Sequence, residues 1–279
     1  MNKIVAKRNV SENLVKFEIK ASGAIRAIKP AQYVIFRIDE NGPRIPLSIL
    51  KVNNERETIT VLVHVTDNGS QQLATMNDGN SLFGIDGPFG IPVKTENFGT
   101  VLCIGRGLGI VSMLPVLNSL RASGNKVIAV LSANSQEGIL LETEIRAASD
   151  EALILTEDGS LGEKGSICHA LRKIQTDSAI NQVFAFGSAK MIKESYSLTR
   201  RHNIPMQAVL YSGRTDESGL NSIFRVIVCP DGKTLCVDGV NFNAYYNSFE
   251  EMIQRFGSKS GEENQIAEVF PAIQGIKYL

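Results

Sequence analysis

The chain has 279 residues, of which 43% are hydrophobic and 21% charged, a balance that is typical of globular proteins. Its 29 basic and 29 acidic residues cancel to a formal net charge of zero, which argues against a surface for nucleic acids or anionic membranes. No apolar run approaches the roughly 20 residues of a membrane span, and the first residues lack the apolar core of a signal peptide. Four scattered cysteines form no disulfide framework. We therefore expect a cytoplasmic protein with reduced thiols and about two domains.

Residues 1–95 alternate apolar and polar positions in short runs such as NLVKFEIKA, QYVIFRID and TITVLVHVT, with turn residues between them. Many short strands with frequent turns indicate an antiparallel sheet that is closed as a barrel or sandwich. We place this first domain at residues 1–97.

Two motifs in the first domain have residues that suit a nucleotide-like cofactor. In PRIPLSIL, residues 43–50, Arg44 can grip a phosphate through two parallel hydrogen bonds, and Ser48 can hydrogen-bond a flavin ring edge or ribityl chain. In NGSQQL, Gly69 and Ser70 open a possible helix whose free N–H groups suit a pyrophosphate. By itself, the first motif somewhat favours the alternative, a charged turn that enters a strand.

Residues 99–211 change character, because strand-like runs alternate with helix-like ones. GTVLCIGRG is a buried-type strand, and IVSMLPVLNSLRASG has helical spacing with Gly124 as its stop. The alternation continues through ILLETEIRAAS to a last strand, MQAVLYSG. This pattern indicates a parallel sheet with helices on both faces, which we place at residues 98–212. Ligands of such sheets bind at the carboxyl ends of the strands.

The motif IGRGLGIVSMLP follows the first strand of this second domain. Its glycines, Gly105, Gly107 and Gly109, lie between a strand and a helix, where they let a phosphate approach the backbone at the helix N-terminus. Tight packing of strand on helix would require the same glycines. Arg106 lies inside the loop, where its side chain either clamps a phosphate or points to solvent.

Two later loops of the second domain also follow strands. TEDGSLGEKG places Asp158, Gly159 and Ser160 where they can contact a nucleotide ribose or amide, and FGSAKMIK places Gly187 and Met191 near a nicotinamide pocket. A polar turn and ordinary packing are the respective alternatives. The run LSANSQEG after the second strand has no basic residue for a 2′-phosphate, so we expect NADH rather than NADPH.

The chain resembles the ferredoxin–NADP reductase superfamily along nearly its whole length. The resemblance lies in five motifs taken together: R-x-P-L-S, G-S, GPFG, G-x-G-x-G and D-G-S-x-G. Within it, the chain most resembles the group of the electron-transfer subunit of dihydroorotate dehydrogenase and the small FAD subunit of NADH-dependent ferredoxin:NADP oxidoreductase. The resemblance implies FAD in the barrel and a pyridine nucleotide in the α/β domain. The FAD contacts that it implies are Arg44, Pro46, Leu47, Ser48, Val63, Gly69 and Ser70. The nucleotide contacts that it implies are Gly105, Gly107, Gly109, Asp158, Gly159, Gly187 and Met191.

The chain departs from the family pattern at three positions of the nucleotide domain. Arg106 and Ser112 stand where the family tends to have glycine and proline, and Ser188 stands where it has proline. All three departures lie in the motifs that the resemblance assigns to nucleotide binding.

Residues 213–279 form a third, smaller segment. Within it, FRVIVCPDGKTLCVDG has the pattern of a β-hairpin, with Cys229 and Cys236 closing its two arms. Relatives bind a [2Fe–2S] cluster through this tail. The positions that correspond to cluster ligands hold Asp216, Asn221, Phe224 and Cys236. Because such clusters need thiolate ligands, normally four, we predict that no [2Fe–2S] cluster is bound, and a reducing compartment disfavours a disulfide across the hairpin.

The resemblance thus implies a FAD-containing oxidoreductase subunit that passes electrons between NAD(H) and a partner redox protein, either a larger flavoprotein or an iron–sulfur protein. The sequence has no nucleophile elbow, and its three histidines are too far apart for metal spacing. We therefore assign no catalytic side chain, since the cofactors carry the chemistry. A non-catalytic subunit of a larger redox complex and a free-standing NAD(P)H–flavin reductase are the two alternatives.

Overall fold

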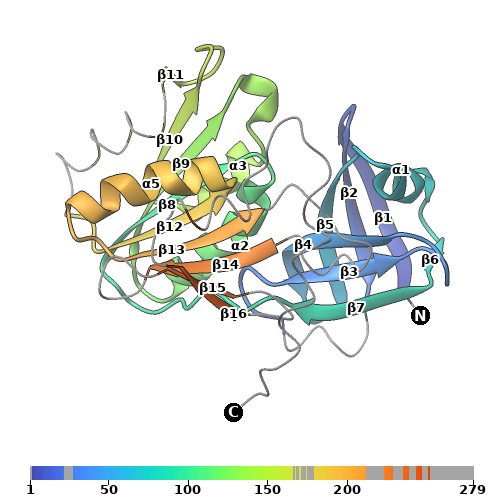
Figure 1. Ribbon diagram of the computed structural model, residues 1–279. Coiled ribbons are helices and arrows are strands. Elements are labelled where there is room, and N and C mark those ends of the chain that lie inside the picture. The colour runs from blue at the N-terminus through green and yellow to red at the C-terminus, as the bar shows by residue number, and fades with distance from the viewer. Residues whose placement is uncertain are drawn as a thin grey trace.

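The computed structural model describes residues 2–21, 28–165, 167, 170, 174, 179–211, 223–228, 235–238, 243–246 and 251, with residue 198 and the three segments between 223 and 246 described as backbone only. Figure 1 shows two lobes, a curled antiparallel sheet and a second sheet flanked by helices. Both lobes correspond to the domains expected from the sequence, a barrel followed by an α/β domain.

The first lobe is an antiparallel sheet of seven strands. They are β1 (Asn2–Ser11), β2 (Leu14–Lys20), β3 (Tyr33–Arg37), β4 (Arg44–Asn53), β5 (Thr58–His64), β6 (Ser81–Leu82) and β7 (Gly84–Phe89). Their order is β6-β1-β2-β5-β4-β3-β7, and a single residue separates the two edge strands β6 and β7 along the chain. The sheet therefore curls back on itself, which confirms the expected barrel. The short helix α1 (Asn68–Thr75) follows β5.

The second lobe contains a nine-stranded sheet. Its strands are β8 (Thr100–Arg106), β9 (Lys126–Ala133), β10 (Glu151–Thr156), β11 (Glu163–Lys164), β12 (Gln182–Gly187), β13 (Met206–Tyr211), β14 (Ile223–Val228), β15 (Leu235–Asp238) and β16 (Asn243–Tyr246). The order is β11-β10-β9-β8-β12-β13-β14-β15-β16, parallel as far as β13 and antiparallel beyond it. The winding reverses between β8 and β12, and ligands of doubly wound sheets bind at this kind of switch point.

Helices cover both faces of the second sheet, as the sequence predicts. They are α2 (Gly109–Ala122), the short 3-10 helix η2 (Gln136–Gly138), α3 (Glu142–Ala148) and α5 (Ala189–Arg201). Alternate residues of β8 pack toward different faces, since Val101 and Cys103 join one apolar cluster while Leu102 and Ile104 join another. Helix α3 begins three residues later than the run ILLETE predicts, because Leu141 has a left-handed backbone (φ 55°) that interrupts the helix.

Helix α2 lies at the junction of the two lobes and is buried along most of its length. Its apolar cluster also contains barrel residues: Leu14, Tyr33, Ile35, Leu50 and Leu62. The two lobes therefore share one continuous core, which fixes the barrel face of β4 against α2.

The third segment continues the second sheet in its described part. Strand β14 pairs with β13, and β14 and β15 form the antiparallel pair expected for the hairpin. The turn between them, with Cys229, lies outside the described residues. Within the part of the chain that the structure describes, no helix is both long and apolar enough to cross a membrane.

Candidate functional site

Strand β4 presents one face to the junction of the two lobes. Because side chains alternate along a strand, Arg44, Pro46 and Ser48 share a face, while Ile45 and Leu47 point into the barrel core. Four residues of strand advance about 13 Å, so an elongated cofactor along this face can reach both Arg44 and Ser48.

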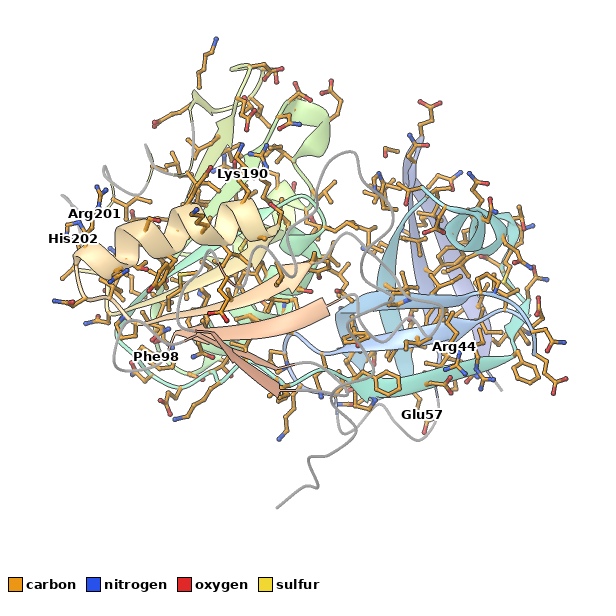
Figure 2. All side chains as sticks on the ribbon, in the orientation of Figure 1. Arg44, Glu57, Phe98, Lys190, Arg201 and His202 are labelled. Atoms are coloured by element: carbon orange, nitrogen blue, oxygen red, sulfur yellow. The ribbon has the colours of Figure 1, made fainter. Side chains whose placement is uncertain are left out.

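Arg44 lies on the barrel, at the start of β4 (Figure 2). Its side chain is exposed and has no ion pair or side-chain hydrogen bond among the described residues. A free guanidinium of this kind is well suited to the anionic end of a bound cofactor. The β4 face therefore fits FAD, which has a pyrophosphate to place near Arg44 and a ring system to place near Ser48.

Two of the expected FAD contacts have buried side chains. Leu47 and Val63 are buried in the apolar core of the barrel. Their side chains face away from the junction, so a cofactor there would meet only their backbone.

The turn at the start of α1 lies beside Arg44. A Cβ at Gly69 would be 3.2 Å from atoms of Pro43 and of Ile45, the two neighbours of Arg44. The Ser70 amide donates to Asp67 Oδ1 at 2.8 Å, and the Ser70 hydroxyl accepts from the Asp67 amide. This capping box uses the N–H that the sequence analysis expected to be free at Ser70, which corrects that expectation. The Ser70 amide is therefore not available to an anion, and Arg44 supplies the positive charge here.

Three hydroxyl groups meet where the two lobes join. Ser48 Oγ lies 2.6 Å from the Tyr211 hydroxyl and accepts a hydrogen bond of 2.9 Å from Ser112 Oγ, and Ser112 also contacts the Tyr211 hydroxyl. The three residues come from β4, α2 and β13. Burial raises the pKa of Tyr211, partly offset by its hydrogen bonds to Ser112 and Ser48, so the phenol is protonated at neutral pH. Each serine has two acceptor lone pairs, so the cluster can still accept a hydrogen bond from a flavin.

Tyr211→Phe is expected to lower the free energy of unfolding by about 1 kcal/mol, because one buried hydrogen-bonding hydroxyl is removed. Chemical denaturation of the wild type, Tyr211→Phe, Ser112→Ala and the double variant measures this effect. Since the two side chains share partners, the two losses should not add. Strict additivity would contradict the cluster.

The glycine loop lies at the switch point of the second sheet. A Cβ at Gly109 would come within 2.1 Å of the Phe186 carbonyl oxygen at the end of β12. Helix α2 has no side-chain cap at its N-terminus and no acidic residue in its first turn. Gly107 has a left-handed backbone (φ 56°) and open space around its Cβ position. The Ile110 and Val111 amides donate to the Gly107 and Leu108 carbonyl oxygens at 3.1 and 3.0 Å, so the terminus attracts a phosphate through the helix dipole, and the open space at Gly107 leaves room for the phosphate to approach.

Gly187 closes the other side of the switch point. Its φ is 156°, and a Cβ there would lie 2.7 Å from Met191 Cε and 3.3 Å from the Arg106 carbonyl oxygen. Met191 is only 2% exposed, and its buried side chain packs against Gly187. The expected place of Met191 near a nicotinamide pocket stays a prediction. Ser188 caps α5 by accepting from the Met191 amide at 3.5 Å.

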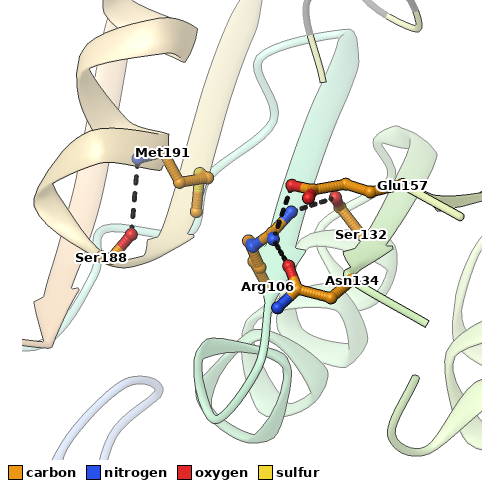
Figure 3. A network of polar contacts seen from close by, with 6 residues as sticks. All are labelled: Arg106, Ser132, Asn134, Glu157, Ser188 and Met191. Carbon is orange, nitrogen blue, oxygen red and sulfur yellow. Dashed lines mark hydrogen bonds and ion pairs between the residues drawn. The ribbon is translucent and has the colours of Figure 1, made fainter. Parts of the chain in front are cut away.

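The Arg106 side chain points away from Ser188 and Met191 and lies across the carboxyl ends of β9 and β10 (Figure 3). Its guanidinium donates to Ser132 Oγ at 3.1 Å and to Asn134 Oδ1, and forms an ion pair of 2.8 Å with Glu157. Sequence analysis named Arg106 but missed its three partners. Each partner lies at or just after the end of β9 or β10. These positions could have been linked to Arg106 only if the order of the strands in the sheet had been known.

The turn after β10 adds a further carboxylate, Asp158, to this corner. Asp158 Oδ1 accepts from the Ser160 hydroxyl at 2.6 Å and from its amide at 2.9 Å, and these hydrogen bonds lower the pKa of Asp158. Ser160 Oγ also accepts from the Gln136 amide at 2.8 Å, which ties the turn to the segment after β9. Gly159 has φ 81°, which suits glycine. Asp158 and Gly159 therefore lie next to the Arg106 network, as expected for a nucleotide edge.

The positions that correspond to [2Fe–2S] ligands of relatives lie only partly within the described residues. Asp216 and Asn221 lie outside the described residues, whereas the backbone of Phe224 pairs with Leu210 and that of Cys236 with Ile227. The described residues contain no group of His, Cys, Asp and Glu that could hold a metal ion. The absence of a [2Fe–2S] cluster stays a prediction.

Comparison with known proteins gives relatives along the whole chain, although no family model matches it. The chain is 29% identical over 270 residues to a homologue of the electron transfer subunit of dihydroorotate dehydrogenase B (NAD(+)) from Thermotoga maritima, covering 97% of this chain and 95% of that protein. It is 24% identical to the corresponding subunit from Fusobacterium nucleatum, over 66% of this chain and 73% of that one.

Comparison with solved structures also gives flavin-type electron-transfer proteins with the same fold. A chain of the NADH-dependent reduced ferredoxin-NADP oxidoreductase, described in connection with flavin-based electron bifurcation, matches with a TM-score of 0.69 and 27% identity over 75% of each chain. A ferredoxin NADP+ reductase from Neisseria gonorrhoeae with bound FAD and NADP matches with a TM-score of 0.55 and 16% identity, over 71% of this chain and 88% of that one. The second likeness shows the fold alone.

Proposed function

We propose that this chain, which has the fold of the ferredoxin–NADP reductases and resembles the electron transfer subunit of dihydroorotate dehydrogenase B, is a FAD-containing subunit that moves electrons between NAD(H) and a partner redox protein. The observation that carries the proposal is the 2.9 Å hydrogen bond from Ser112 to Ser48. It joins the β4 face, which fits FAD, to the helix whose N-terminus suits a nucleotide phosphate. The two cofactor sites therefore meet.

Each part of the junction has a distinct task in this proposal. Arg44 binds the pyrophosphate of FAD, Pro46 fixes the strand beneath the cofactor, and Ser48 binds the edge of the flavin ring. Gly107 and Gly109 let the phosphates of the nicotinamide nucleotide approach α2. Bound FAD supplies the chemistry, since a flavin exchanges a hydride with a nicotinamide and single electrons with a one-electron partner.

The nucleotide in this proposal is NADH rather than NADPH. Three carboxylates, Glu137, Glu157 and Asp158, lie around the corner where β9 and β10 end. Two basic residues lie near them, Arg106 and Lys164, of which Lys164 packs against Gly159. A 2′-phosphate carries negative charge and is disfavoured beside a surplus of carboxylates.

The proposed partner is a larger flavoprotein or an iron–sulfur protein. If no [2Fe–2S] cluster is bound, electrons leave the flavin directly for this partner over a short gap. The buried thiol of Cys103, a free cysteine, is compatible with the cytoplasmic location that is part of the proposal.

The test is purification of the protein with measurement of its flavin content and of its NADH oxidation with ferricyanide, a one-electron acceptor. The proposal predicts about one FAD per chain and turnover with NADH. A stoichiometric flavin without NADH oxidation would instead favour the non-catalytic subunit. Turnover of the monomer with free flavin or oxygen would favour the free-standing reductase.

A further inference from the structure

We propose that Ser112 and Tyr211 hold the hydroxyl group of Ser48 so that it accepts, but does not donate, a hydrogen bond at the flavin edge, and that this contact favours the reduced form of FAD. The inference rests on the proposed function and deepens it, because it gives two residues outside the β4 face a part in setting the reduction potential of the flavin. Both are positioning residues, since they act through Ser48.

The three hydroxyl groups form a closed ring of hydrogen bonds. Each of them has a single hydrogen to donate. Ser112 donates its hydrogen to Ser48 Oγ at 2.9 Å, so Ser112 accepts in its contact with the Tyr211 hydroxyl. Tyr211 then has no hydrogen left for Ser48, and Ser48 donates to the Tyr211 oxygen at 2.6 Å. All three hydrogens are therefore used inside the ring, and none is left for a ligand.

Burial and packing hold this ring in place. Ser48 is 8% exposed and Ser112 is 1% exposed, so water has little access to either oxygen. Burial raises the pKa of Tyr211, with a smaller opposite effect of its two hydrogen bonds, so the phenol keeps the hydrogen that the ring requires. The elements that carry the three residues, β4, α2 and β13, all contribute to the apolar cluster at the junction. The direction of the Ser48 hydroxyl is thus fixed by its neighbours.

A lone pair of Ser48 is what remains for the flavin. Ser48 Oγ has two acceptor lone pairs, and Ser112 occupies one of them. Ser48 lies on the β4 face that fits FAD, together with Arg44 and Pro46. An oxygen with a free lone pair and no free hydrogen attracts an N–H group and repels the lone pair of another acceptor.

The flavin nitrogen that exchanges a hydride, N5, changes its hydrogen-bonding character when the flavin is reduced. In oxidised flavin N5 has a lone pair and accepts a hydrogen bond. The hydride from NADH brings two electrons and one hydrogen to N5, NADH leaves as NAD+, and N5 becomes an N–H donor. An acceptor-only Ser48 beside N5 therefore stabilises reduced flavin relative to oxidised flavin, and the reduction potential rises.

The inference predicts a lower reduction potential in Tyr211→Phe. Without the phenol oxygen, the Ser48 hydrogen loses its acceptor and becomes available to oxidised flavin. Equilibration of the purified FAD-containing protein with a reference dye, without oxygen and without nucleotide, measures the potential. We expect the equilibrium ratio of reduced to oxidised flavin to fall about 10-fold, the equivalent of about one hydrogen bond. For a two-electron couple this is a shift of about 30 mV to lower potential.

Three further variants show whether the effect passes through Ser48. Ser112→Ala leaves two hydrogens for the one remaining contact, so it should shift the potential in the same direction as Tyr211→Phe. In a Ser48→Ala background, Tyr211→Phe should cause no further shift, because the oxygen that contacts the flavin is gone. Tyr196→Phe is the matched control, since Tyr196 is a buried tyrosine of the second lobe that belongs to the other apolar cluster. It should keep the wild-type potential.

The outcomes separate this inference from the proposed function and from a purely structural role of the ring. A ring that only joins the two lobes would lower the stability of Tyr211→Phe and leave its potential unchanged. If Tyr211→Phe binds flavin at the wild-type potential or a higher one, or if its shift persists in the Ser48→Ala background, the inference is wrong and the proposed function stands. If the wild type contains no flavin, both are wrong.

Discussion

Replacing Arg44 by glutamine is expected to remove most of the flavin from the purified protein. Charge-assisted hydrogen bonds contribute about 1.5–3 kcal/mol each, so losing the guanidinium should weaken FAD binding by roughly 10- to 100-fold. The physical reason is that Arg44 is the exposed cation at the start of the β4 face and has no protein partner to satisfy it among the described residues. Flavin absorbance per protein after dialysis measures the effect.

A matched control lies on the same strand. Lys51 is an exposed cation near the other end of β4, and Lys51→Gln changes the net charge as Arg44→Gln does. It should keep its flavin. Arg44→Lys should keep an intermediate amount, because a lysine retains the charge but cannot form two parallel hydrogen bonds. Equal flavin content in Arg44→Gln and the wild type would show that the pyrophosphate is bound elsewhere.

Gly109→Ala is expected to abolish nucleotide binding and to destabilise the fold by more than about 4 kcal/mol, an exceptional loss for one methyl group. Its Cβ would overlap the Phe186 carbonyl oxygen at 2.1 Å. The backbone fixes the positions of both atoms, so no side-chain rotation can relieve the overlap. Chemical denaturation together with NADH titration measures the two effects.

Gly107→Ala provides the comparison within the same loop. Nothing lies within 4 Å of a Cβ at this position, although its φ is 56°, so the cost should be roughly 1 kcal/mol of left-handed backbone strain. The variant should fold and bind NADH weakly. Equal losses of stability and of NADH binding in the two variants would show that the close contact between α2 and the end of β12 does not limit the residue at position 109.

Features that depend on local periodicity were predictable from the sequence. The alternating pattern of the first 95 residues predicts the antiparallel sheet, and the strand–glycine–helix pattern predicts the loop of Gly105, Gly107 and Gly109. Gly124 ends helix α2 with φ 84°, as its position indicated. A motif does not show which of its side chains are buried. The strand register buries Leu47, and Val63 lies in the same core.

Contacts between distant segments could not be predicted in this way. Ser48 and Tyr211 are 163 residues apart, and Arg106 and Glu157 are 51 apart. Their meeting depends on the strand order and on how the barrel packs against α2, and no spacing rule in the sequence encodes either. The sequence analysis expected no cation near the end of the second strand, but Arg106 reaches that point from the first strand.

The most direct test of the central claim is the visible absorption spectrum of the purified protein before and after addition of NADH without oxygen. A working junction of the β4 face and the α2 loop predicts flavin absorption bands that NADH bleaches, with no broad iron–sulfur absorption underneath. A flavin spectrum that NADH leaves unchanged, or a protein with no flavin at all, would contradict the claim that the two cofactor sites meet at Ser48 and Ser112.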